Sequence, residues 1–432
     1  MAQDDLLTAT DTRSYELVST VTGPDAPPTG SEFTYASLSR TSTLNTAAAT
    51  SSAETASFSS TSGVESTSTE DTATNLVGSQ PVSTALNGTA SLSVPSTSTS
   101  SAPAATNTQP CNGHPELCSR KYSNITEVCA HNSPFVQRNN FASNQAYPVV
   151  NQLTDGVRML QMQTHHNATT NTLHLCHTSC EILDAGLLQD YLRTVVDWLN
   201  GNPYEVITIL LGNSDVVDVT EYVAPIRDSG LIDFLYTPPS IPMDIDGWPT
   251  LAEMILSGRR VVLFLDYEAR QNEVPYILDE FSYMWETPFS PTNNSFPCSE
   301  DRPPGLDPNV ARQRMYIANH NLNAQISFLG TDLLIPDTVS LPRTNAADGN
   351  GSLGAMAQEC QNTWGRAPNF LLLDYYNVGG GSVFQVAAEH NGLSYNRECC
   401  GETVSGASCL FKGFFTMLWP YMMIGVMLVL SR

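Results

Sequence analysis

Short apolar runs recur along residues 109–400, and this recurrence constrains the fold more than any other feature of the chain. Seven runs have the length of a β-strand, at 125–131, 156–163, 172–177, 205–213, 260–267, 315–320 and 369–376. Helical spacing separates several of them: apolar residues recur every three or four positions from Leu188 to Leu199, before a stop at 200–203. Apolar strands that alternate with helices are typical of a parallel sheet buried on both faces. Seven or eight such units predict an α/β fold, a (β/α)8 barrel of the TIM type that is either closed or distorted and incompletely closed.

Polar residues end nearly every strand-length run, and they are the candidate functional residues. In a (β/α)8 barrel the carboxyl ends of the strands converge on one mouth, where active sites lie. A single polar residue at a strand end usually only begins a loop, whereas a set at corresponding positions predicts a site. The candidates are His131, Asn132, Gln161, Gln163, His177, Asn213, Asp266, His320, Asp374 and Tyr375.

Residues 1–108 differ sharply in composition from the rest of the chain. They are dominated by Ser, Thr and Ala and contain neither Cys nor Trp. Such a segment cannot bury enough apolar surface to offset its chain entropy. We therefore expect a disordered, O-glycosylated stalk over 1–108, a folded domain over 109–400, and a small-residue linker with a hydrophobic tail over 401–432.

The charge balance limits the partners of the chain. The sequence has 19 Lys and Arg against 43 Asp and Glu, a formal net charge of −24. The long-range field of such a chain repels nucleic acid and anionic membrane surfaces, so neither is expected as a general partner. The sequence does not predict an oligomeric state.

All ten cysteines lie beyond residue 110, and their spacing favours disulfides over zinc. The two close pairs lack a second Cys-x-x-Cys partner, which a zinc site of that type needs. The predicted bridges are Cys111–Cys118, Cys176–Cys180 and Cys298–Cys360. For the adjacent Cys399 and Cys400 we predict different partners.

N-glycosylation sequons in the folded part agree with an oxidising compartment. They lie at Asn124, Asn167, Asn293 and Asn350. Disulfides persist outside the cytosol, so the sequence predicts an extracellular or cell-surface glycoprotein.

The C-terminal tail contains an uncharged stretch, Gly413 to Leu430, that is about as long as a minimal membrane span. Small residues at 405–408 precede it, which is typical of a GPI-attachment signal, although the spacer is short. A retained transmembrane helix and a buried core helix are the alternatives. The first ten residues have neither a basic nor an apolar region, so no signal peptide is expected in the sequence as given. The tail therefore predicts the membrane as a partner.

Six stretches resemble one known family. "AHNS", "GVRMLQMQ", "LCHTSCEILDAG", "NPYEVITILL", "RVVLFLDY" and "NFLLLDYYNVGGGS" are similar, in order and spacing, to the X-domain barrel of phosphatidylinositol-specific phospholipase C. The resemblance is strongest to fungal secreted phospholipase C-like phosphodiesterases and runs from about Cys111 to Cys400. It implies a TIM barrel that cleaves a phosphodiester next to a free hydroxyl.

The resemblance also implies roles for three residues. By the family pattern, His131 is the general base, His177 is the general acid, and Asp374 orients the base and stabilises its imidazolium. Histidine suits both proton transfers because its pKa lies near neutrality. The remaining strand-end candidates are expected to contact substrate.

The chain departs from the family on its second strand. Bacterial members carry an Arg there, and calcium-dependent members a Glu and an Asp, whereas this chain has Gln161 and Gln163, with Asn132 after the first histidine. By strand alternation both glutamines point inward and Arg158 points away. Neutral amides cannot replace a guanidinium clamp or a calcium carboxylate shell. The sequence therefore predicts neither a metal nor a cofactor.

Two functions from different classes fit these features. The first is a phosphoric diester hydrolase acting without a metal on an inositol- or glycerol-type phosphodiester, such as a phospholipid or lipid-anchor headgroup. The second is a catalytically silent barrel that serves as a cell-surface binding or structural protein. Both histidines and Asp374 favour the enzyme, and the two glutamines favour the silent barrel.

Overall fold

The structure is a computed structural model, and it describes residues 109–328 and 331–401. The predicted stalk, 1–108, and all but the first residue of the predicted tail, 402–432, lie outside the described residues.

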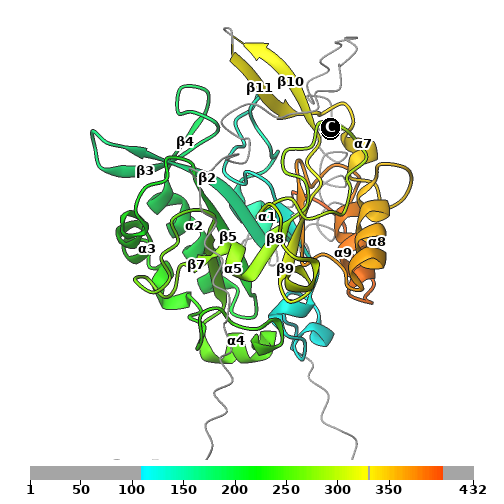
Figure 1. The fold of residues 1–432 in the computed structure, drawn as a ribbon, viewed down its shortest axis with the longest axis horizontal. Coiled ribbons are helices and arrows are strands. Elements are labelled where there is room, and N and C mark those ends of the chain that lie inside the picture. The colour runs from blue at the N-terminus through cyan, green and yellow to red at the C-terminus, as the bar shows by residue number, and fades with distance from the viewer. Residues whose placement is uncertain (1–108, 329–330, 402–432) are drawn as a thin grey trace, which may run out of the picture. The chain divides into compact units, whose positions relative to one another are not determined.

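Eight parallel strands form the barrel that the apolar runs predict (Figure 1). In sheet order they are β7 (Leu278–Asp279), β6 (Val261–Leu265), β5 (Ile207–Asn213), β2 (Met159–Asn167), β1 (Glu127–Ala130), β12 (Phe370–Leu373), β9 (Met315–Asn319) and β8 (Met284–Glu286). The strands at the two ends of this order, β7 and β8, do not pair with each other in the described part of the chain. The barrel is therefore incompletely closed, which was one of the two forms predicted from the sequence.

Side chains along the barrel strands alternate between two apolar clusters. In β1, Val128 belongs to the cluster that includes the buried faces of the outer helices, and Cys129 belongs to the other. In β6, Leu263 and Phe264 divide in the same way. Because successive strand residues point to opposite faces, the second cluster fills the barrel and the first joins it to its helices.

Helices cover the outside of the barrel, with α2 and α3 at the left and α8 and α9 at the right of Figure 1. The predicted helix is α2 (Leu188–Gly201), whose Leu188, Leu192 and Leu199 are buried. The other helices are α1 (Val149–Asp155), α3 (Val223–Asp228), α4 (Leu251–Ser257), α5 (Glu280–Tyr283), α6 (Pro308–Ala311), α7 (Leu341–Thr344), α8 (Leu353–Trp364) and α9 (Ser382–His390). Short 3-10 turns occur at Pro115–Leu117, Tyr122–Asn124, Val219–Tyr222, Leu231–Phe234 and Ile245–Gly247.

One predicted barrel strand is not part of the barrel. The run at 172–177 forms β3 (Thr172–Cys176), which pairs antiparallel with the far end of β2 and with β4 (Asp184–Leu187). A second hairpin, β10 (Asn323–Phe328) and β11 (Thr331–Pro336), projects at the top of Figure 1. The prediction missed β7 and β8 because strands of two and three residues have no recognisable period.

Three predicted disulfides are present, and one prediction about cysteine is wrong. Cys111–Cys118, Cys176–Cys180 and Cys298–Cys360 are bonded. Cys399 and Cys400 are bonded to each other rather than to different partners. The other cysteine in the described ranges, Cys129, is a buried thiol in β1 and is not available to either of them.

The four sequons of the folded domain are all on the surface. Asn124, Asn167, Asn293 and Asn350 are exposed, as an N-glycosylated asparagine must be. None of the helices in the described part of the chain is long and apolar enough to span a membrane.

Carboxyl groups are buried where β6, β7 and β8 end. Glu280 and Glu286 are 0% and 3% exposed, and Arg302 places its guanidinium 3.3 Å from Glu286 and 3.5 Å from Asp266. Burial raises the pKa of Asp266 to about 6 and that of Asp279 to about 7. Burial, followed by the charge of Glu286, raises the pKa of Glu280 well above its ordinary value. One guanidinium therefore faces more acids than it can neutralise.

These raised pKa values predict that the domain is more stable in mild acid. Asp266 and Asp279 bind their protons more tightly in the folded than in the unfolded chain, where an aspartate titrates near pH 4. Folding therefore takes up protons between about pH 4 and about pH 7, and the free energy of unfolding falls as pH rises through that window. Urea unfolding at a series of pH values measures this slope, which Asp279→Asn should flatten. A stability that rises steadily from pH 4 to 7 would contradict it.

Candidate active site

His131 and Asp374 form a buried couple at the carboxyl ends of adjacent strands. β1 and β12 pair in parallel, with Ala130 opposite Leu373. The residues that follow these two, His131 and Asp374, therefore lie side by side. His131 Nδ1 is 2.8 Å from Asp374 Oδ1, and the two residues are 7% and 1% exposed. An ionised carboxylate only accepts hydrogen bonds, so Nδ1 carries the proton and Nε2 keeps the lone pair that a base needs.

Two residues of the loop after β1 hold this couple, and neither was predicted from the sequence. Asn144 Nδ2 donates to Asp374 Oδ1 at 2.8 Å and lies 3.3 Å from His131 Nδ1. Gln145 Nε2 donates to the backbone carbonyls of His131 and Leu373. Their segment has no apolar period, and only its nearness to a candidate histidine would have drawn attention to it.

The couple also contains acceptors that are not satisfied by protein groups. Asp374 Oδ2 and Asn144 Oδ1 are buried, and no hydrogen-bond donor of the described residues reaches either atom. Buried acceptors of this kind cost free energy unless water or a ligand donates to them. Each of these two acceptors would be stabilised by a hydrogen bond from water or from a ligand that reached the couple.

His177 lies in the loop after β3, which the Cys176–Cys180 disulfide closes. It is 4% exposed, and its backbone N–H donates to Leu183 O. Its ring meets the ring of Phe135 edge to face, with 5.2 Å between centroids. Phe135 lies in the loop that follows His131, where its backbone N–H donates to Asn132 O. The structure therefore brings the two histidine loops into contact.

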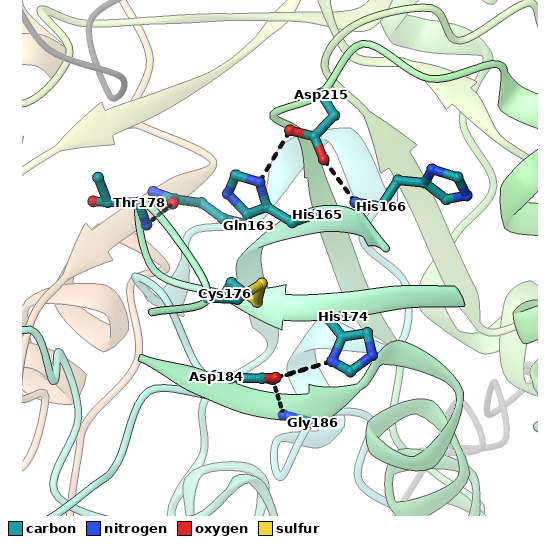
Figure 2. Close-up of a disulfide and its surroundings, with 10 residues drawn as sticks. Gln163, His165, His166, His174, Cys176, Thr178, Asp184, Gly186 and Asp215 are labelled. Atoms are coloured by element: carbon teal, nitrogen blue, oxygen red, sulfur yellow. Dashed lines mark hydrogen bonds and ion pairs between the residues drawn. A yellow bond between two sulfur atoms is a disulfide. The ribbon is translucent and has the colours of Figure 1, made fainter. Parts of the chain in front are cut away.

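Both glutamines of β2 accept hydrogen bonds from these loops. Gln161 Oε1 accepts from the backbone N–H of Asn132 at 2.8 Å, and Gln163 Oε1 accepts from that of Thr178 at 3.0 Å. Figure 2 shows the second contact beside the disulfide. The amide oxygens predicted to face substrate are thus bonded to backbone.

The donor set does not fit a calcium ion. Asn132 is fully buried with no hydrogen bond to its side-chain amide among the described residues, but the oxygens of both glutamines already accept backbone N–H groups. Calcium requires six to eight oxygens, several of them anionic. The one described cluster of three potential metal ligands is Cys176, Cys180 and Asp184, and its sulfurs are joined as a disulfide.

Asn213 and Asp266 brace a loop. Asn213 Nδ2 donates to the carbonyls of Val217 and Tyr267, and its Oδ1 accepts from the N–H of Val217. Asp266 Oδ1 accepts from the backbone N–H groups of Asn213 and Tyr267. The Nδ2 group of Asn213 is used by this loop, and the contact of Asn213 with substrate stays a prediction.

His320 and Tyr375 also have structural partners. His320 is 0% exposed, its Nε2 lies 2.9 Å from Thr344 O, and burial lowers its pKa to about 3. The ring is enclosed by the protein, and its contact with substrate stays a prediction. The Tyr375 hydroxyl donates to Ser143 O and its N–H donates to Asn144 O, so Tyr375 supports the segment that holds the couple.

Comparison with known proteins finds relatives over most of the domain. The chain is 57% identical over 339 residues to an "Uncharacterized secreted protein" of Arthroderma benhamiae, which covers 78% of this chain and 76% of that one. It is 43% identical over 285 residues to "PI-PLC X domain-containing protein 1" of the same fungus, covering 66% and 90%. Phosphatidylinositol-specific phospholipase C from Listeria monocytogenes matches with a TM-score of 0.42 and 11% identity, over 63% of this chain and 95% of that one.

A family model decides the assignment. The model described as "PI-PLC X 1" matches residues 117–391, more than half of the chain, and this span contains both histidines and Asp374. The resemblance seen in the six sequence stretches is confirmed: the chain belongs to the PI-PLC X domain family.

Proposed function

We propose that the protein is a phosphoric diester hydrolase that cleaves an inositol- or glycerol-type phosphodiester by acid–base catalysis between His131 and His177. The observation that carries the proposal is the buried contact of 2.8 Å between His131 Nδ1 and Asp374 Oδ1 at the barrel mouth. It fixes the tautomer that leaves Nε2 as a base. Family membership supports the same reaction class.

The proposed reaction uses the two histidines in turn. His131 Nε2 takes the proton of a substrate hydroxyl next to the phosphate, and the hydroxyl oxygen forms a new bond to phosphorus. The bond from phosphorus to the leaving oxygen breaks, and His177 gives that oxygen its proton. Asp374 stabilises the imidazolium formed on His131. Water then opens the cyclic phosphodiester while the two histidines exchange roles.

The proposed mechanism uses no metal and no cofactor. Its support is the chemistry of the residues at the family's metal positions, where Gln161 and Gln163 supply neutral oxygens already bonded to backbone N–H groups. In this mechanism, hydrogen-bond donors and an imidazolium stabilise the negative charge that develops on the phosphate, and no cation on β2 takes part.

A silent binding barrel is the second candidate function. The absence of a charged side chain at positions 161 and 163 favours it, because losing one preorganised charge-stabilising group typically costs about 10²–10³ in rate. In this case the buried acceptors beside Asp374 would bind a hydroxylated headgroup without cleaving it.

We place the protein outside the cell. The disulfides Cys111–Cys118, Cys176–Cys180 and Cys298–Cys360 and the exposed sequons support an oxidising compartment, and one similar protein is named as secreted. Anchoring through Gly413 to Leu430, by a GPI anchor or a transmembrane helix, stays a prediction.

Replacing the histidines tests the mechanism. We expect His131→Ala and His177→Ala each to lower the rate on a cleaved phosphodiester by about 10²–10⁴-fold, and the double variant to cost little more than one of them. His390→Ala, a half-buried histidine at the end of α9, is the matched control. Rates near the parent value for both variants would exclude the paired-histidine mechanism, and a parent that cleaves nothing in a panel of phosphodiesters would favour the silent barrel.

Asp374→Asn tests the couple itself. The amide keeps the shape of the side chain but removes the charge that stabilises imidazolium, so we expect kcat to fall by about 10²-fold or more with the melting temperature nearly unchanged. Steady-state kinetics and a thermal melt of the same preparation measure both quantities. An unchanged kcat would remove Asp374 from the mechanism.

Chelation tests metal independence. We expect full activity after dialysis against EDTA, and no increase of the melting temperature on adding calcium, because the residues at the family's ligand positions on β2, Gln161 and Gln163, are neutral and already accept backbone N–H groups. A rate that is lost with chelator and restored by calcium would place the ligands elsewhere in the mouth.

A further inference from the structure

We propose that Gln161 and Gln163 are positioning residues: each holds one of the two histidine loops by its backbone, and the strand between them sets the distance between the histidines. This deepens the proposed function and rests on it for the catalytic meaning of the distance. The hydrogen bonds themselves are present whatever the reaction is.

The two contacts have the same form. Gln161 Oε1 accepts from the N–H of Asn132, the residue directly after His131. Gln163 Oε1 accepts from the N–H of Thr178, the residue directly after His177. Each histidine is therefore one residue from a backbone group that β2 holds in place.

The residues that are held also share an unusual backbone conformation. Asn132 has φ 48° and Thr178 has φ 60°, both in the left-handed region. A β-branched residue such as Thr178 rarely adopts this conformation, which persists only where surrounding contacts require it. The hydrogen bond to each glutamine is such a contact, and it turns the chain just after each histidine.

The spacing of the two glutamines supplies the distance. They are two residues apart on the same face of a strand, which separates them by about 7 Å. β2 is hydrogen-bonded to β5 from Met159 to Thr164, so this separation is fixed by the sheet. A strand held in register is a more rigid reference than either loop.

This role explains why amides occupy both positions. A backbone N–H in a buried site needs an acceptor, and the oxygen of glutamine provides one without adding charge. An arginine at 163 has no acceptor. Gln163→Arg therefore loses the contact with Thr178 even though it restores the cation of bacterial family members.

Hydrogen exchange tests directly the two hydrogen bonds that the glutamines accept from Asn132 and Thr178. We use the full-length chain, deuterium exchange and mass-spectrometric fragmentation to single residues. Gln163→Met should speed exchange of the Thr178 amide by about tenfold and leave Asn132 unchanged, and Gln161→Met should do the reverse, since each removes one hydrogen bond. Gln163→Glu keeps an acceptor and should restore protection at Thr178. The exposed Gln385→Met is the matched control and should change neither amide.

The kinetic arm separates positioning from substrate binding. If a phosphodiester is cleaved, Gln163→Met should lower kcat by about 10- to 100-fold with KM unchanged, because a small displacement of one catalytic group is costly. A raised KM with kcat unchanged would show that the side chain binds substrate and would overturn the proposal.

The hydrogen-exchange experiment does not depend on activity. It therefore tests the two glutamine hydrogen bonds even if the parent cleaves nothing and the proposed function fails. Should Gln161→Met not fold, the comparison of Gln163→Met with Gln163→Glu decides alone. Equal exchange at Thr178 in the parent and in Gln163→Met would overturn the proposal.

Discussion

The mouth of this barrel is governed by the need to satisfy backbone hydrogen-bonding groups where little water reaches. Loops leave every strand end there, and buried N–H and C=O groups must be paired. Neutral amide side chains meet this need: Asn345 donates to the carbonyls of Asp374 and Tyr375, as Gln145 does to those of His131 and Leu373. An amide offers both a donor and an acceptor and avoids the cost of a buried charge.

Charge in the mouth is unevenly distributed as a result. One side holds the His131–Asp374 couple, which neutral amides support. Where β6 and β8 end, Asp266 and Glu286 share the guanidinium of Arg302. Arg302 also donates to the Tyr267 hydroxyl and is buried among aromatic rings. Removing its carboxylate partners would leave a buried charge without compensation, which destabilises a fold. Arg302 therefore stabilises the fold at the mouth, whether or not a ligand binds there.

Sequence reasoning succeeded where periodicity or chain order carries the information. The apolar runs predicted the barrel, and the family resemblance paired His131 with Asp374, which the parallel pairing of β1 and β12 brings to the same edge of the sheet. It misplaced β3 because a hairpin strand and a barrel strand have the same apolar composition. The role of Asn144 and the hydrogen bond of His320 to Thr344 were not predicted, because the direction of a side chain depends on loop packing that no local pattern encodes.

The open seam between β7 and β8 has a consequence for the behaviour of the protein in concentrated solution. An open sheet has two edges, and unpaired edges invite another chain to add a strand. Here the edge strands are only two and three residues long, and α5 connects them directly. The N–H and C=O groups available for such addition are therefore few. The barrel remains incompletely closed without presenting a template on which copies of the chain would aggregate.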